Sequence, residues 1–181
     1  MTRNTLETSM AGIGSIWGPL STEVIAGARE QMQRLVQAPE GEDWLAQLHR
    51  ARPLNEELYR DPEHGFVLLA HTEAAGLYRP PHDHGRSWVI YAVQQGEVEM
   101  GTYARVQAPD GSLRLVRRGS TVVSPGDVQV YLPGDIHDTR CLNGPALLFR
   151  FTERDLKKED KEEGRVTRYV ACEGAWAPAC A

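Results

Sequence analysis

The alternation of apolar and polar residues divides the chain into a helical beginning and a long β-rich remainder. Residues 21–36 carry apolar side chains at helical spacing, behind Ser21 or Thr22 as a possible N-cap. Residues 42–51 repeat this pattern, and Pro53 stops it. We therefore expect two helices before the first strand.

From residue 53 on, the pattern changes to short runs of β-branched and aromatic residues. Glycine, proline, aspartate and asparagine separate these runs, and pairs such as Gln95-Gly96 and Asn143-Gly144 predict turns. No helical stretch intervenes, which disfavours a parallel α/β sheet and favours a sandwich or barrel. The expected strands cover residues 66–74, 87–95, 97–107, 112–118, 121–125, 127–133 and 146–153.

The last part of the chain is strongly charged. Residues 153–165 alternate in sign, which predicts a solvated hairpin or loop. Residues 165–170 regain apolar alternation, and we expect them to return as a final strand.

Composition restricts the class of protein and its partners. A chain of 181 residues suits one domain with a sizeable core. The net charge of −5 argues against nucleic acid as a partner, and no apolar run reaches the roughly 20 residues needed to cross a bilayer. Cys141, Cys172 and Cys180 are odd in number and lack metal-knuckle spacing, which fits a reducing compartment. We expect a cytoplasmic monomer or homodimer without nucleic-acid or membrane partners.

Three histidines stand in a pattern that suggests metal binding. His82 and His84 are two residues apart in an extended context, so their side chains point the same way. His137 follows the turn predicted at Pro133-Gly134. Three imidazoles on neighbouring strands can hold a divalent transition metal and leave coordination positions open for substrate. The alternative is that the H-x-H is only a polar strand end.

Two stretches around these histidines resemble the two cupin motifs. The first runs through Gly76, His82, His84, Val89 and Gly96, and the second is echoed by Gly126, Pro133, Gly134 and His137. Val89 stands where the family usually has glutamate, Cys141 stands where asparagine is common, and Pro133 is one residue closer to the histidine than usual.

The resemblance covers about residues 56–152. It implies an all-β fold, a double-stranded β-helix or jelly-roll barrel, with a metal inside and short N-terminal helices outside. We expect residues 1–52 to form a helical segment packed on the barrel, and residues 53–181 to form the barrel and a C-terminal extension.

The valine at the glutamate position changes the expected chemistry. Three neutral ligands leave the full charge of a divalent ion, which suits an anionic ligand such as a thiolate. The chain also resembles cysteine dioxygenase-like cupins, the thiol dioxygenases, in its N-terminal helices, the F-x15-H spacing from Phe66 to His82, and the strand 145–151. This resemblance implies Fe(II) as cofactor and the addition of both atoms of O2 to the sulfur of a small thiol, giving a sulfinate.

Other departures bear on which thiol is used. Glu56 stands where cysteine dioxygenases place a carboxylate-binding arginine, and Leu148, Arg150 and Thr152 stand where a Ser-His-Tyr set is found. The cysteine-tyrosine cross-link of the mammalian enzymes cannot form, because Val89 and Thr152 occupy its positions. These departures argue against strict cysteine specificity. We expect a mercapto-carboxylic acid, of the mercaptosuccinate, 3-mercaptopropionate or cysteine type.

Arg150 is the candidate residue for binding that carboxylate. Strand alternation and the family register turn it into the barrel, where a guanidinium needs an anionic partner. A structural pair with Asp or Glu is the alternative. Tyr91 is expected to reach the substrate, and His71 to line the cavity, either as an additional donor or as a satisfied core histidine. Three further arginines could take a second carboxylate at the mouth: Arg60, Arg79 and Arg86.

Two other functions stay open on the sequence alone. The three histidines could serve another metal-dependent cupin enzyme, such as a diketone-cleaving dioxygenase or an isomerase. The barrel could also bind a small molecule without catalysis.

Overall fold

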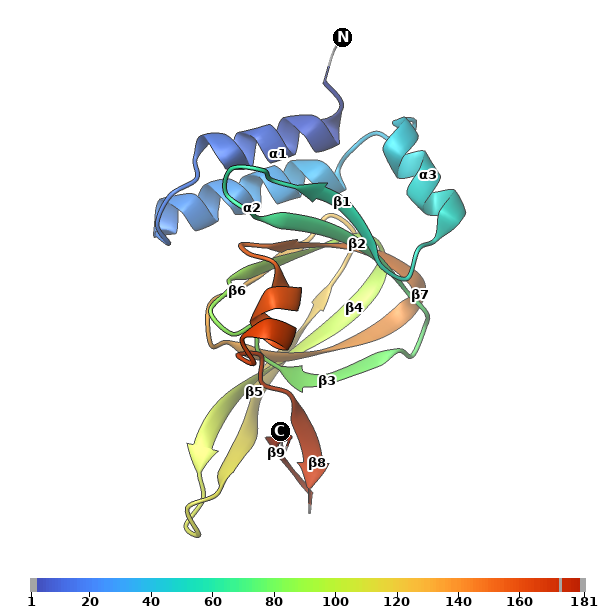
Figure 1. The fold of residues 1–181 in the computed structure, drawn as a ribbon. Coiled ribbons are helices and arrows are strands. Elements are labelled where there is room, and N and C mark those ends of the chain that lie inside the picture. The colour runs from blue at the N-terminus through green and yellow to red at the C-terminus, as the bar shows by residue number, and fades with distance from the viewer. Residues whose placement is uncertain (1–2, 173, 180–181) are drawn as a thin grey trace.

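Three helices precede a curled antiparallel sheet in the computed structural model, which describes residues 3–172 and 174–179 (Figure 1). Cys180 and the last residues of the expected 53–181 unit lie outside this description. The helices are α1 (Thr5–Ser15), α2 (Thr22–Val36) and α3 (Asp43–Ala51). The second and third match the two expected helices, and the Ser21 side chain accepts a hydrogen bond from the Val24 amide at 3.3 Å.

The first helix was not predicted. Gly12 and Gly14 give its sequence a low helix propensity, which hides the helix from a pattern search. A capping box offsets this, since Asn4 accepts from the Glu7 amide and the Glu7 side chain accepts from the Asn4 amide. The Asn-x-x-Glu spacing was therefore the signal that could have revealed α1.

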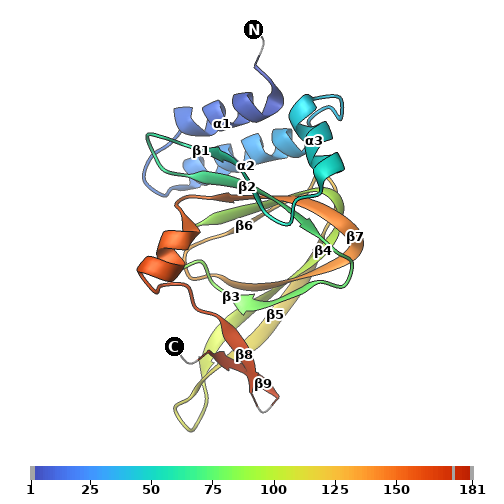
Figure 2. The ribbon, with the colours of Figure 1, turned by 45° about the vertical axis from the view of Figure 1, so that its right-hand side comes forward.

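In the described part of the chain, nine strands form one sheet in the order β1-β2-β7-β4-β5-β9-β8, with β3 paired to β7 and β6 paired to β4. Because the two longest strands, β4 and β7, pair along most of their length and bend, the sheet curls into a barrel-like body (Figures 1 and 2). The all-β class with short N-terminal helices is confirmed. The bounds are β1 (Glu56–Arg60), β2 (Val67–Glu73), β3 (Tyr78–His82), β4 (Val89–Gln107), β5 (Leu113–Val123), β6 (Val128–Tyr131), β7 (Ile136–Thr152), β8 (Tyr169–Cys172) and β9 (Ala175–Pro178).

Two of the predicted turns were wrong, because the chain continues through them as strand. Strand β4 passes through Gly96 and β7 passes through Asn143-Gly144, with register shifts between Gln95 and Val98 that mark bulges. Gly96 has φ +79°, and a Cβ there would lie 2.5 Å from the carbonyl oxygen of Asn143. Glycine at this position thus serves a close approach of two strands and not a chain reversal.

The two faces of the sheet have different surroundings. Leu68 of β2, Ile90 of β4 and Phe149 of β7 point outward and form one core with helices α1 to α3. Val89 of β4 and Leu148 of β7 point inward and join a separate core inside the barrel. The helical segment therefore covers the outer face of the sheet, and the inner face is left for a site.

The C-terminal part differs from its prediction. The charged run 153–165 is mostly exposed or half-exposed, as predicted, but it contains a short π-helical segment, Lys158–Glu162, in which Glu159 is only 1% exposed. The expected strand at 165–170 begins later, at Tyr169. It forms a hairpin with β9, and Trp176 pairs with Leu115 of β5.

Within the described residues, no helix has both the length and the apolar character that crossing a membrane requires.

Candidate metal centre

The three predicted histidines converge inside the barrel. His82 ends β3, His84 follows in the next loop, and His137 stands near the start of β7, directly opposite His82 in the strand pairing. One ligand nitrogen from each ring lies within 4.8 Å of the others, and the Nε2 atoms of His84 and His137 are 3.4 Å apart. Two imidazole nitrogens bound at about 2.1 Å to one ion at a right angle would be about 3 Å apart. The cluster is therefore close to the geometry of a shared ion.

The hydrogen bonds of the rings fit the same conclusion. His82 Nδ1 donates to the Pro80 carbonyl at 2.9 Å, which leaves its Nε2 lone pair free for a metal. The Nδ1 atoms of His84 and His137 are buried without a protein partner. Burial lowers the pKa of all three rings, so they are neutral, which is the form that binds metal. The donor set thus fits a divalent transition metal.

The residues around the cluster supply no carboxylate ligand. The described group of ligand atoms contains only the three imidazoles, and Val89, fully buried on the inner face, has no donor atom. The Tyr91 hydroxyl lies 3.4 Å from His84 Nε2, and the Tyr131 ring stacks on His137 with centroids 4.0 Å apart. Burial raises the pKa of Tyr91, so its hydroxyl keeps its proton and can donate. The side chains that contact the histidine rings here are therefore aromatic and carry no carboxylate.

A cavity of about 640 Å³ opens beside the cluster, with His82 and His84 in its wall. Its barrel side includes Tyr91, Leu148 and Arg150. Its other side comes from the C-terminal segment, which contributes Leu156, Lys157, Asp160, Lys161, Val166, Arg168, Tyr169 and Val170. These last residues were not predicted as site residues, since only the folded chain brings them back to the barrel.

Arg150 occupies the inner face as the strand alternation predicted. It pairs with Tyr91 of β4 on one side and Leu69 of β2 on the other, and it lines the cavity. Its Nε is buried and has no hydrogen-bond partner, and among the described residues no carboxylate forms an ion pair with it. The structural pair considered as an alternative is thus missing from the described part of the chain.

His71 lies near Arg150 on the same wall. Its Nδ1 donates to the Leu54 carbonyl at 3.3 Å, while its Nε2 is buried without a partner. Burial, followed by the charge of Arg150, lowers the pKa of His71 to about 3. The ring is therefore neutral, with a hydrogen bond at Nδ1 and none at Nε2. It is neither the fully hydrogen-bonded core histidine nor an established donor to a ligand, the two alternatives that the sequence left open.

The other three arginines separate into two groups. Arg79 lines the cavity and donates through Nε to Glu73 at 2.7 Å. Arg60 pairs with Glu57 and Asp155, and Arg86 with Glu159 and Glu163, and neither is among the residues lining the cavity. Of the arginines considered for a second carboxylate, the structure places only Arg79 beside Arg150 in the cavity wall.

Glu73 is a cavity residue that the sequence analysis did not select. It is buried, and its Oε2 has no partner, although Oε1 accepts from Arg79. The signal was available, because alternation along β2 puts Glu73 on the same face as His71. A carboxylate at this point partly neutralises the charge of Arg79.

Comparisons with known proteins add structural likenesses only. No family model and no curated protein matches the chain. An oxalate oxidase in complex with glycolate matches with a TM-score of 0.39 and 25% identity, over 50% of this chain and 42% of that one. A cupin domain from Schizosaccharomyces pombe matches with a TM-score of 0.45 and 14% identity over 61% and 66%.

A third likeness is KdgF from a Halomonas species, with a TM-score of 0.41 and 23% identity over 55% and 79% of the two chains. This chain spans less than half the length of the oxalate oxidase chains that it matches. The assignment of the barrel rests on the strand order and register described above, and the function has to be argued from the site itself.

Proposed function

We propose that the protein is a mononuclear Fe(II) thiol dioxygenase that acts on a small mercapto-carboxylic acid. The proposal rests on three neutral imidazoles and on an arginine in the wall of the adjoining cavity. Among the described residues, the imidazoles have no carboxylate as a fourth ligand and the arginine has no acidic partner. A ferrous ion bound there would supply Lewis acidity toward the thiol and the redox capacity that O2 requires.

The residues of the chain have definable tasks in this reaction. Arg150 would bind the substrate carboxylate through its planar fork and so orient the sulfur toward the histidine cluster. The Tyr91 hydroxyl, close to His84, would donate a hydrogen bond to the reacting group. Val89, Leu148 and Tyr131 would limit water next to the cluster. The net reaction, R–S⁻ plus O2 to R–SO2⁻, balances without another reductant, because sulfur loses the four electrons that O2 gains.

The proposal is tested by supplying thiols to protein loaded anaerobically with Fe(II). Oxygen uptake and sulfinate formation, identified by mass spectrometry, are followed with mercaptosuccinate, 3-mercaptopropionate and cysteine. Succinate and oxalate serve as thiol-free controls, the latter because oxalate oxidase is among the structural likenesses. We expect one sulfinate per O2 with at least one of the thiols and no uptake with the controls.

The matched variant is His137→Ala, with His64→Gln as control outside the cluster. Removing one of three ligands should abolish most iron binding and all turnover, while the control should keep both. Full iron occupancy in His137→Ala would overturn the metal assignment. Iron binding with no thiol turnover in the unsubstituted protein would overturn the thiol proposal and favour another metal-dependent reaction or a binding function.

A further inference from the structure

Residues 82–86, which we call the histidine loop, carry two of the three candidate metal ligands. They are bound to a distant part of the chain, residues 154–170, which we call the C-terminal strap. The strap runs beside β3: the Asp83 amide donates to the Thr167 carbonyl at 3.0 Å, and His82 forms a bridge with Arg168. Figure 2 shows this segment, including the short orange helix, leaving β7 and descending past β3 toward β8. The strap also forms one side of the cavity.

Asp83, between His82 and His84, reaches toward the strap. It is only 3% exposed, and its Oδ1 accepts from the Thr167 amide at 2.8 Å and from the Gly85 amide at 3.1 Å. Its Oδ2 accepts from the Arg105 guanidinium of β4. The buried Asp83 carboxylate thus connects the histidine loop to the strap and to strand β4, and it also accepts a hydrogen bond from within the loop.

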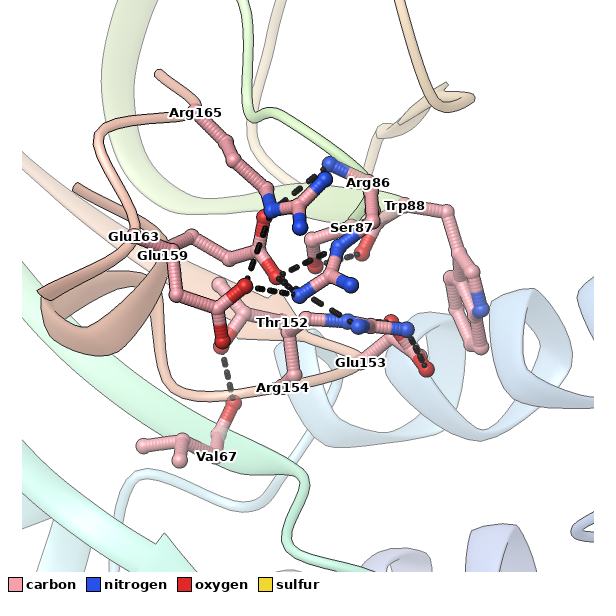
Figure 3. Close-up of polar contacts among 10 residues, drawn as sticks. All are labelled: Val67, Arg86, Ser87, Trp88, Thr152, Glu153, Arg154, Glu159, Glu163 and Arg165. Carbon is pink, nitrogen blue, oxygen red and sulfur yellow. Dashed lines mark hydrogen bonds and ion pairs between the residues drawn. The ribbon is translucent and has the colours of Figure 1, made fainter.

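Glu159 makes the opposite connection, from the strap to the loop (Figure 3). Its Oε1 accepts from Arg86 Nη2 at 2.8 Å and from Nε at 3.2 Å, and its Oε2 accepts from the Arg86 amide at 3.2 Å. Arg154 adds a contact at 3.3 Å. The Glu159 side chain is 1% exposed whereas that of Arg86 is 45% exposed, so a partner from the surface holds the buried carboxylate.

At Gly85 the histidine loop and the strap are in close contact. Gly85 has φ +62°, and a Cβ at this position would lie 2.7 Å from Glu159 Oε2 and 3.2 Å from Arg165 Cβ. A glycine is therefore required for the strap to approach the residue that directly follows His84.

We propose that Asp83 and Glu159 are positioning residues for the metal centre, and that metal binding and the ordering of the strap are coupled through them. The inference rests on the metal site of the proposed function and not on the thiol chemistry. If the strap orients His82 and His84, then a metal held by these histidines must stabilise the strap by the same free energy, because linkage is reciprocal.

The first test uses the unsubstituted protein and follows amide hydrogen exchange with and without Zn(II), and with Fe(II) under anaerobic conditions. We expect the amides of residues 159–169 to exchange more slowly with either metal, and the tip of the β4–β5 hairpin, residues 108–112, to be unaffected. Metal binding without protection of the strap would overturn the coupling.

The second test compares the metal affinities of Asp83→Asn and Glu159→Gln with those of Asp110→Asn and Glu99→Gln, measured by competition with a chelator. Asp110 pairs with Arg114 at the tip of the β4–β5 hairpin, and Glu99 pairs with Arg117 of β5, so neither carboxylate makes the contacts of Asp83 and Glu159 with residues 85–86 and 167. Substitution of a residue that supports a metal ligand typically lowers metal affinity by about 10–100-fold. We expect a loss of this size in Asp83→Asn and Glu159→Gln and none in the two control variants.

Two further outcomes complete the design. Loss of metal-dependent strap protection in Asp83→Asn would support the proposal, and wild-type metal affinity with unchanged strap protection in both Asp83→Asn and Glu159→Gln would overturn it. If these variants do not fold, the exchange experiment on the unsubstituted protein still decides. Failure of thiol oxidation with retained coupling would refute only the proposed reaction.

Discussion

Strand β7 presents two faces with opposite demands. Phe149 and Phe151 point to the helices and are fully buried among aromatic rings, with Phe66 and Trp88 about 5 Å from Phe151. Leu148 and Arg150 of the same strand point into the barrel, where a cavity and an unpartnered Nε lie side by side. Alternate residues of one strand therefore serve different ends.

The outer face of the sheet contributes most of the burial that stabilises the fold, and the inner face carries the candidate functional residues. The outer face is apolar and closed, so its energy comes from burial of large side chains. The inner face holds polar atoms whose hydrogen bonds the protein does not satisfy, which destabilises the chain unless a ligand compensates. Such local violations are expected at functional sites.

The strongest way to sharpen this comparison is to truncate one residue from each face. Phe149→Ala removes a fully buried ring against Trp44 and should lower the free energy of unfolding by about 3–5 kcal/mol. Leu148 borders the cavity, so the space created by Leu148→Ala joins a volume that is already empty. We therefore expect the free energy of unfolding to fall by about 2 kcal/mol, near the lower end of the range for leucine. Urea denaturation of the metal-free proteins measures both, and equal losses would contradict the division of roles.

Arg150 tests the inner face from the functional side. Replacing it with Met removes a guanidinium without an acidic partner, so stability should hold or rise, whereas binding of a mercapto-acid should weaken. A charge-assisted contact of about 1.5–3 kcal/mol corresponds to roughly 10–150-fold in KM or Kd. Arg150→Lys keeps the charge but loses the planar fork, and should also bind more weakly. Calorimetry with succinate provides a thiol-free reading, and unchanged affinity in Arg150→Met would make the arginine structural.

Strand β7, with Phe149 on its outer face and Arg150 on its inner face, also shows what the sequence could predict. Alternation predicted that Leu148, Arg150 and Thr152 share one face, and the family resemblance was needed to turn that face into the barrel. The spacing of His82, His84 and His137 was enough to predict their convergence. Tyr91 and Leu69 lie beside Arg150 because of the register of β7 against β4 and β2. The β4–β7 register includes bulges, and these could not be predicted from the sequence.

The strap is the part that sequence reasoning could not place. The alternating charges of 153–165 indicated solvation, but a pattern of charges does not tell which carboxylate is buried. Glu159 is buried because Arg86, 73 residues earlier, lies opposite it in the folded chain. The same long-range return puts Arg168 and Tyr169 in the cavity wall.

The neutral His71 makes a prediction about pH. Its pKa in the folded protein is about 3, below the value near 6.5 of an unfolded chain, so the unfolded state binds more protons between these values. Stability attributable to His71 is therefore complete above about pH 6.5 and falls as pH decreases toward 3, by at most about 1.4 kcal/mol per pH unit. In metal-free protein, His71→Gln should reduce the slope of unfolding free energy between pH 4 and 6. An unchanged slope would mean that the ring is protonated or solvated in the native state.

Arg60 should give the smallest effect, and it sharpens the comparison from outside the barrel. Its guanidinium is bound by Glu57 at 2.7 Å and by Asp155 at 2.9 Å, with about two fifths of its side chain exposed. Exposed pairs of this kind contribute about 0–1 kcal/mol, so Arg60→Gln should change the free energy of unfolding by no more than that. Because Arg60 does not line the cavity, the KM for a mercapto-acid should also stay within about twofold of the unsubstituted value, in contrast to Arg150→Met. The two variants are measured side by side with the same thiol. A KM effect of Arg60→Gln equal to that of Arg150→Met would show that the substrate carboxylate reaches the outer rim, and would move the carboxylate site from the inner face of β7 to the edge formed by β1.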